Sequence, residues 1–227
     1  LDIVLLKAPG LPDGPNLLLA KAAMGEKVFT IGADVTRNKI RVYPPGKVVF
    51  LPAKGLPFAR LHHDAYSQPG NSGGAIVNSS GHLVGIVASG GDGKSEAIPV
   101  QAIGALKTES GAKHHQRSIE IGAAIRICVL KLEEVRSKRH RHLAVEDAKA
   151  VATSCTRSQN RQLIDLAAQT LGLAGHVESS IRMFERSLKE DPNALNSRIG
   201  LLVSLSMGRR YENSLPHLRW LLNNGVK

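Results

Sequence analysis

The segment Asp64-Ala-Tyr-Ser-Gln-Pro-Gly-Asn-Ser-Gly-Gly74 holds the residues whose types and spacing could do chemistry. In a Gly-x-Ser-Gly-Gly turn, a serine hydroxyl stands on a tight bend where the backbone can approach a substrate carbonyl. Glycines supply backbone freedom there, and the N–H groups of Gly70 and Ser72 can both point at a developing oxyanion. The pattern predicts Ser72 as a nucleophile, with an oxyanion hole at Gly70 and Ser72. The alternative is a purely structural glycine-rich hairpin.

The elements that position this turn are expected to be β-strands. Short aliphatic and β-branched runs alternate with Gly, Pro and Asp clusters up to about Val100. These runs are residues 3–6, 28–31, 40–42, 48–51, 75–77 and 83–87. Their spacing predicts an antiparallel sandwich or barrel with many tight turns.

The turn and two later stretches together resemble trypsin-like serine proteases, most closely the HtrA (Deg) branch. The later stretches are Gly81-His-Leu-Val-Gly-Ile-Val-Ala-Ser-Gly90 and Glu96-Ala-Ile-Pro99. The resemblance covers roughly residues 1–105, and the order and spacing of the stretches are more specific than the pentapeptide alone. It implies an antiparallel β-barrel and peptide-bond hydrolysis through an acyl-enzyme on Ser72.

The same resemblance assigns Asp2 to the catalytic triad. Asp2-Ile-Val-Leu-Leu-Lys7 is similar to the family strand whose Asp orients the catalytic histidine; the alternative is a charged residue at a frayed terminus. The family histidine precedes this Asp in a Thr-Ala-Ala-His-type segment, whereas only Leu1 precedes Asp2 here. We therefore expect a fragment with two of three triad members and the second of two barrels, inactive as an isolated chain.

A primary specificity pocket is implied between Tyr66 and the strand Ala88-Ser89-Gly90. No Asp stands at its base, which argues against a preference for Lys or Arg. Tyr66 is bulky, so either the pocket is shallow and takes small aliphatic side chains or the ring swings aside; the alternative is that Tyr66 packs in the barrel. Asn71 replaces the Asp that pairs with a new N-terminus in digestive proteases, which argues against that zymogen switch.

None of the nine histidines matches the motif of a catalytic base. We predict surface positions for them, in the strand before the nucleophile turn (His62, His63), in a hairpin turn (His82), in basic linkers (His114, His115, His140, His142) and in helices (His176, His217).

The C-terminal part is expected to be helical. Residues 119–132 show a weak helical face made of Ile119, Ala123, Ile127, Leu130 and Leu132, although a strand stays possible. Beyond them a 34-residue shift superimposes similar residues, and this period resembles the tetratricopeptide repeat (TPR). The packing positions of the first unit would be Ile164, Ala167, Ala168, Leu171, Ser180 and Phe184, with Pro192 closing it; Leu201, Leu205, Ser214 and Leu218 would repeat them. The alternative is a plain helical hairpin with a coincidental period.

Residues 110–116 and 136–142 are the predicted linkers, and the second is the densest basic patch of a chain with net charge +11. Without interleaved aromatic residues, this patch argues for a solvated helix end rather than a nucleic-acid site. Cys128 and Cys155 lack a CxxC spacing, which argues against zinc. Their pairing cannot be read from the sequence, and we expect two buried free thiols.

The sequence thus predicts a multidomain β + α protein, with a partial trypsin-like barrel at 1–108, a basic helical linker or degenerate helix pair at 109–158, and two TPR-like repeats at 159–227. The expected function is a serine endopeptidase acting on proteins or peptides, with a protein partner on the repeats. The alternative is a non-catalytic protease-like scaffold. No metal or organic cofactor is implied, no run of about 18 apolar residues could span a membrane, and the family resemblance favours an extracytoplasmic site.

Overall fold

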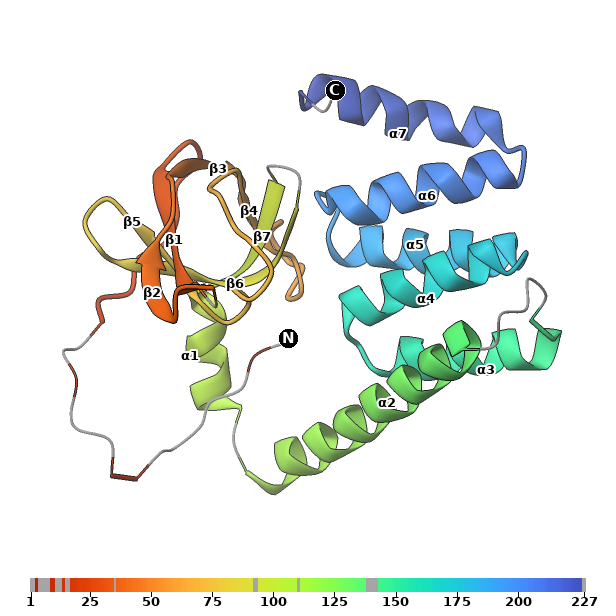
Figure 1. Cartoon of the computed structure of the whole chain (residues 1–227), viewed down its shortest axis with the longest axis horizontal. Helices are drawn as coiled ribbons and strands as arrows, with labels where there is room; N and C mark the ends of the chain where they lie inside the picture. The colour runs from red at the N-terminus through yellow and green to blue at the C-terminus, as the bar shows by residue number, and fades with distance from the viewer. Residues whose placement is uncertain are drawn as a thin grey trace. The chain divides into compact units, whose positions relative to one another are not determined.

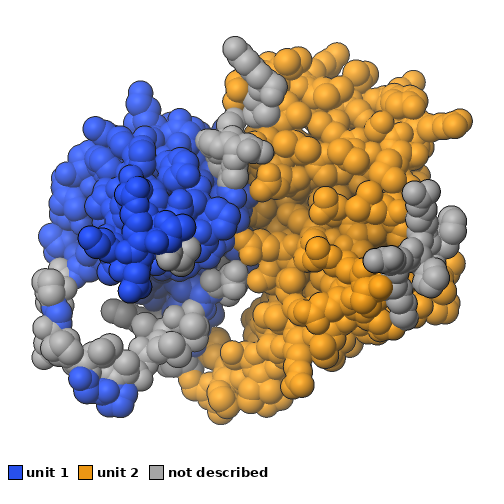
Figure 2. Space-filling model, in the orientation of Figure 1, with its two compact units in different colours: residues 1–110 blue, residues 111–227 orange. Residues whose placement is uncertain are grey.

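The computed structural model describes residues 3, 9–10, 14, 17–34, 36–91, 94–109, 111–137 and 143–225. The chain divides into two compact units, residues 1–110 and residues 111–227 (Figure 2). Each unit has its own hydrophobic core. In the described part of the chain, no helix is both long enough and apolar enough to cross a membrane.

The first unit is an antiparallel barrel (Figure 1). Its strands are β1 (Lys27–Asp34), β2 (Lys39–Val42), β3 (Gly46–Phe50), β4 (Leu61–His63), β5 (Ala75–Asn78), β6 (Leu83–Gly91) and β7 (Lys94–Pro99). The pairing runs β1–β3–β4–β7–β6–β5, and β5 pairs back onto β1, which closes six strands into a ring. β2 extends the far half of β1 as a hairpin. Closure leaves those six strands without an open edge.

The barrel core follows from the alternation of side chains along each strand. On β1, Val28 and Thr30 are buried while Lys27 is exposed, as the period of two requires. Small and β-branched residues from facing strands fill the interior, among them Val28, Val48, Leu61, Ile76, Val84 and Ala97. The fold class predicted from the sequence, a β-barrel followed by an all-α region, is confirmed.

Helices follow the barrel. α1 (Gln101–Thr108) belongs to the first unit. The second unit contains α2 (Ala112–Ser137), α3 (Val145–Arg157), α4 (Arg161–Leu173), α5 (Val177–Glu190), α6 (Leu195–Met207) and α7 (Tyr211–Asn223). Within the second unit, helices next to each other in the sequence pack together, and α2 is the longest (Figure 1).

The 34-residue period recurs in the backbone of the second unit. The His176 N–H donates to Leu171 O at 2.9 Å, and 34 residues later the Arg210 N–H donates to Leu205 O at 2.8 Å. Each turn contains a residue with positive φ, Gly175 at 90° and Arg209 at 56°. The two helix pairs α4–α5 and α6–α7 therefore turn in the same way.

Two predictions for the start of the helical region were wrong. α2 begins at Ala112, so residues 112–116 are helical rather than a linker. Its predicted apolar face is buried only at Leu132, because Ile119, Ile127 and Leu130 are about half exposed, and Cys128 is the other buried residue of α2. Only the C-terminal part of the helix reaches the core.

The two cysteines are buried, as predicted, but they are not free thiols. Cys128 on α2 and Cys155 on α3 form a disulfide across 27 residues of sequence. Both lie in the core cluster of the helical unit, beside Leu132, Val151 and Ile164. The disulfide therefore ties α2 to α3 at the point where α2 enters the core.

Candidate functional site

Ser72 lies on the loop between β4 and β5, where its side chain is exposed. The flanking glycines adopt the left-handed conformation, with φ of 96° at Gly70 and 84° at Gly73, which L-residues with a β-carbon disfavour. The Ser72 Oγ–H donates to Ala88 O on β6 at 3.4 Å, its one hydrogen bond among the described residues. The glycines therefore present the hydroxyl on an outward bend, as the sequence pattern suggested.

The backbone N–H groups of Gly70 and Ser72 have no acceptor among the described residues, whereas their neighbours do. The Asn71 N–H donates to Gln68 O at 3.0 Å, and the Gly73 N–H donates to Val87 O at 2.8 Å. Two N–H groups separated by one residue are thus left open beside the serine, and such a pair can bind an oxyanion.

Asn71 holds the Ser72 loop against β1, a role that the sequence did not reveal. Its side chain is 1% exposed. Nδ2–H donates to Ala33 O at 3.2 Å, and Oδ1 accepts the Gln68 N–H at 2.9 Å. The Gln68 side chain adds a second link, because Nε2–H donates to Tyr43 Oη at 2.9 Å. The position of Asn71 directly before the serine was the only signal for this role.

Replacing Asn71 by alanine is expected to lower the free energy of unfolding of the barrel by about 2–3 kcal/mol. The change removes two part-buried hydrogen bonds that hold the loop, one to Ala33 O and one from the Gln68 N–H, and each such bond contributes about 1 kcal/mol or somewhat more. Urea unfolding followed by far-UV circular dichroism measures the loss. Ser72→Ala is the matched control, because its hydroxyl is exposed and makes one long bond. Equal urea midpoints for Asn71→Ala and the unmodified chain would contradict the prediction.

The residues predicted to line a specificity pocket lie close to their neighbours. A Cβ added to Gly90 would stand 3.2 Å from Ser67 Cβ and 2.7 Å from Ser95 Oγ. Between Ser67 and Gly90 there is thus no room for a substrate side chain. The Tyr66 ring is 51% exposed and stacks on Tyr43, with centroids 5.7 Å apart, so Tyr66 does not pack inside the barrel.

The remaining two residues of the predicted pocket wall lie on β6. Ala88 is buried and contributes its carbonyl to the Ser72 hydroxyl. The Ser89 Oγ–H donates to Glu96 Oε2 on β7 at 3.1 Å. Ser67 and Ser95 were not among the predicted pocket residues. Both lie close to Gly90 and belong to the same wall.

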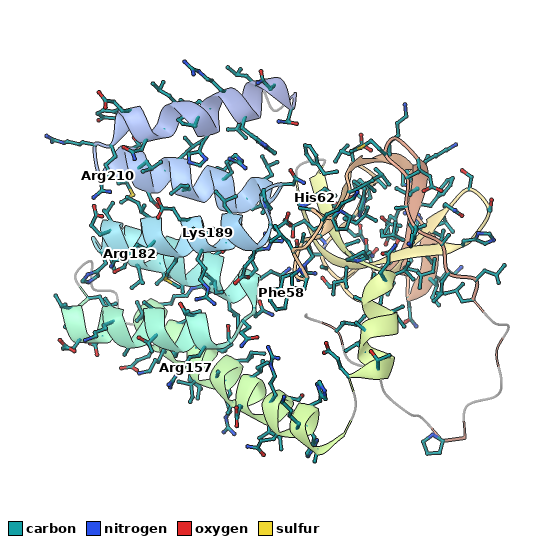
Figure 3. The ribbon with its side chains drawn as sticks, turned by 180° about the vertical axis from the view of Figure 1, so that it is seen from behind. Phe58, His62, Arg157, Arg182, Lys189 and Arg210 are labelled. Atoms are coloured by element: carbon teal, nitrogen blue, oxygen red, sulfur yellow. A yellow bond between two sulfur atoms is a disulfide. The ribbon has the colours of Figure 1, made fainter. Side chains whose placement is uncertain are left out.

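The other predicted triad member, Asp2, lies outside the described residues. The prediction of surface histidines was wrong for His62 and His63, which are both buried on β4 (His62 is labelled in Figure 3). The period of two places Leu61 and His63 on one face of this short strand, and Leu61 belongs to the barrel core. Ser72 Oγ has no histidine partner among the described residues.

Burial, and to a smaller extent the charge of the neighbouring His62, lower the pKa of His63 from 6.5 to about 4. Neither ring nitrogen of His63 has a hydrogen-bond partner of ordinary geometry among the described residues. The folded barrel therefore holds His63 neutral at pH 7. An imidazole that resists protonation in this way is a packed core group rather than a base for Ser72.

The stability of the barrel is expected to fall by roughly 3 kcal/mol as the pH drops from 6.5 towards 4. In this window the unfolded chain binds a proton at His63 and the folded chain does not, so acid favours unfolding. The measurement is the urea midpoint across this pH range, with an NMR titration of the His63 ring. A ring that titrates near pH 6.5 in the folded protein would contradict the prediction.

Comparisons with known proteins bear on the first part of the chain. Residues 1–86 match the sequence model of the trypsin-like peptidase domain. No curated protein matches the chain significantly. A similar solved structure is Rv3671c from Mycobacterium tuberculosis H37Rv, in the inactive form of a serine-to-alanine mutant, with 16% identity and a TM-score of 0.36. The match covers 44% of this chain and 55% of that one, so the chain spans about half of that protein's length. Residues 1–86 are thus the part of this chain that is similar to the trypsin-like peptidase domain.

Proposed function

We propose that Ser72 is the nucleophile of a serine endopeptidase of the trypsin-like class, in the HtrA-like branch. The observation that carries the proposal is the Ser72 loop. An exposed serine hydroxyl stands between two left-handed glycines, beside two N–H groups with no acceptor among the described residues. The family match of residues 1–86 supports the same class of chemistry.

In this mechanism Ser72 Oγ attacks the scissile carbonyl carbon of a peptide. The hydroxyl proton would pass to a histidine base, and Asp2 would hold that imidazole in the correct tautomer. The Gly70 and Ser72 N–H groups bind the oxyanion of the tetrahedral intermediate. The histidine then protonates the departing amine, and water hydrolyses the acyl-enzyme on Ser72.

The helical unit would contribute a protein-binding surface of TPR type. Its support is the shared turn geometry of α4–α5 and α6–α7 at a 34-residue spacing. Ser180 and Ser204 also bring α5 and α6 close together, with their Oγ atoms 2.8 Å apart. Small residues at such crossings let helices approach closely, and stacked pairs of this kind form extended binding surfaces.

Covalent labelling tests the proposed nucleophile. The full-length protein is treated with a fluorophosphonate, which reacts with an activated serine, and the adduct is located by mass spectrometry of the digested protein. We expect one major adduct, on the peptide that contains Ser72. Rapid labelling of a different serine would refute the assignment.

A non-catalytic scaffold is the second candidate, and the contact between Ser67 and Gly90 favours it. An active endopeptidase needs space for a substrate side chain, whereas these two residues are packed together. A full-length protein that is folded and labels on no serine would establish the scaffold function. Labelling on Ser72 would exclude it.

The site of action is proposed to be extracytoplasmic. The Cys128–Cys155 disulfide supports this proposal, because disulfides persist in oxidising compartments and are rare in the cytosol. Alkylation of the protein in freshly lysed native cells tests it. Protection of both cysteines until a reductant is added is expected, and immediate alkylation of both would contradict the proposal.

A further inference from the structure

The helical unit contains a groove of about 1190 Å³ between α2 and α3, which reaches only Gln159, the first residue of the predicted repeat region. Its floor is apolar and is formed by Ile121, Ala124, Ile127 and Ala150. On α2 the lining runs from Lys113 to Ile127, which corresponds to roughly 21 Å of helix at 1.5 Å per residue. A helix of about four turns fits that length.

α2 presents this groove because its N-terminal half leaves the core. The disulfide joins Cys128, about two thirds of the way along α2, to Cys155 near the end of α3, so the earlier turns of α2 extend past α3 (Figure 1). Ile127 is 48% exposed. An amphipathic helix is normally stabilised by covering its apolar side, and this half of α2 keeps apolar residues without such a cover among the described residues of its own unit.

The rim of the groove is predominantly cationic at one end. Lys113 and Arg117 lie one turn apart on α2, and Arg157 ends α3 (Figure 3). The ends of the two helices meet here, because Arg117 Nη2–H donates to Gln159 Oε1 at 3.4 Å. None of these three cations forms an ion pair with a described residue, and each is exposed. The lining also contains a fourth cation, Lys149, and two carboxylates, Glu120 and Glu146. Cations outnumber carboxylates, so the net charge of the groove lining is positive.

We propose that this groove docks an acidic amphipathic helix of a partner protein. The apolar side of that helix would cover Ile121, Ala124 and Ile127, and carboxylates at one end would pair with Arg117 and Arg157. Charge complementarity selects this occupant over a basic or neutral helix. The inference goes beyond the proposed peptidase function, since it requires neither Ser72 nor the repeats.

The test is binding of a fluorescent 16-residue peptide to the 227-residue chain, measured by fluorescence anisotropy. The peptide has leucine at helical i, i+3, i+4 and i+7 positions, glutamate at one end and alanine elsewhere. A second peptide has lysine in place of glutamate. We expect the glutamate peptide to bind at least about 10-fold more tightly than the lysine peptide, with affinity that falls as salt is added.

Variants locate the binding. The double variant Arg117→Glu with Arg157→Glu is expected to bind the glutamate peptide about 10-fold more weakly, or weaker still. The matched control is Arg182→Glu with Lys189→Glu, two exposed cations of α5 outside the groove (Figure 3), which should change affinity less than about 2-fold. All four positions are exposed, so the variants should fold, and circular dichroism verifies that they do.

Three results would overturn the proposal. The first is a lack of charge selectivity, seen either as equal affinity for the two peptides or as an equal loss of affinity for the glutamate peptide in both double variants. The second is a concentration-dependent dimer that dissociates in the Ile127→Glu variant. A second copy of the chain would then be the occupant of the groove. The third is slow amide hydrogen exchange along residues 113–127 that the peptide leaves unchanged, which would show that the chain covers its own groove.

Discussion

Replacing Ser72 by alanine is expected to lower kcat/KM for peptide hydrolysis by the full-length protein about 10⁴-fold or more. Alanine has no oxygen with which to form the acyl-enzyme, so the reaction loses its covalent path. The oxyanion donors and substrate binding would leave a small residual rate. Because the Ser72 side chain is exposed and its Oγ makes one 3.4 Å bond, the change should leave the barrel folded.

Ser79→Ala is the matched control for this prediction. It removes an exposed serine hydroxyl from the turn between β5 and β6, outside the Ser72 loop and the predicted pocket wall, and should change kcat/KM less than about 3-fold. The measurement is cleavage of an unstructured protein substrate such as casein by purified full-length variants. Activity that survives Ser72→Ala undiminished would assign hydrolysis to a different residue.

Removing the Cys128–Cys155 disulfide is expected to lower the free energy of unfolding of the helical unit by about 3–4 kcal/mol. The bond closes a loop with a sequence separation of 27 residues, and chain-entropy arguments give that magnitude for a loop of this length. Both sulfurs lie in the core that joins α2 and α3 to α4. The N-terminal half of α2 should unfold first, because the buried residues of α2 that pack against the other helices lie in its C-terminal half.

The measurement uses Trp220, the single tryptophan, which lies on α7 and therefore reports on the helical unit. Urea midpoints are compared for the oxidised chain, the reduced chain and the variant with both cysteines replaced by alanine. Thr153→Ala is the control, because Thr153 is an exposed residue of α3. If oxidised and reduced chains unfold at the same urea concentration, the disulfide does not stabilise this unit.

Some features of the candidate site are local and could be predicted. Glycine on both sides of Ser72 favours left-handed backbone, and that preference depends on the residue itself rather than on its surroundings. The strands β1, β2, β3, β5 and β6 likewise follow from local runs of β-branched residues. β7, with the sequence Lys-Ser-Glu-Ala-Ile-Pro, lacks such a run and is a strand because β4 and β6 pair with it on both sides.

Other features depend on residues far apart in the sequence, and these the sequence did not reveal. Asn71 bonds a carbonyl 38 positions earlier, and no local pattern encodes that distance. His63 looks like a polar surface residue until its strand takes a place between β3 and β7. The apolar residues of α2 predicted one buried face. The helix is buried only where α3 packs against it, around Cys128 and Leu132, and α3 ends at Arg157.

By itself, the sequence determined the order of a β part and an α part, the position of the glycine-flanked Ser72 turn, and the period of the last helices. These depend on backbone preference and hydrophobic spacing, which act over a few residues. The tertiary structure alone decided which side chains meet: the support of the Ser72 loop by Asn71, the contact of Ser67 with Gly90, the joining of Cys128 to Cys155 and the open groove on α2. Contacts of this kind arise from burial and packing across the whole unit, where the free energy depends on every neighbour at once.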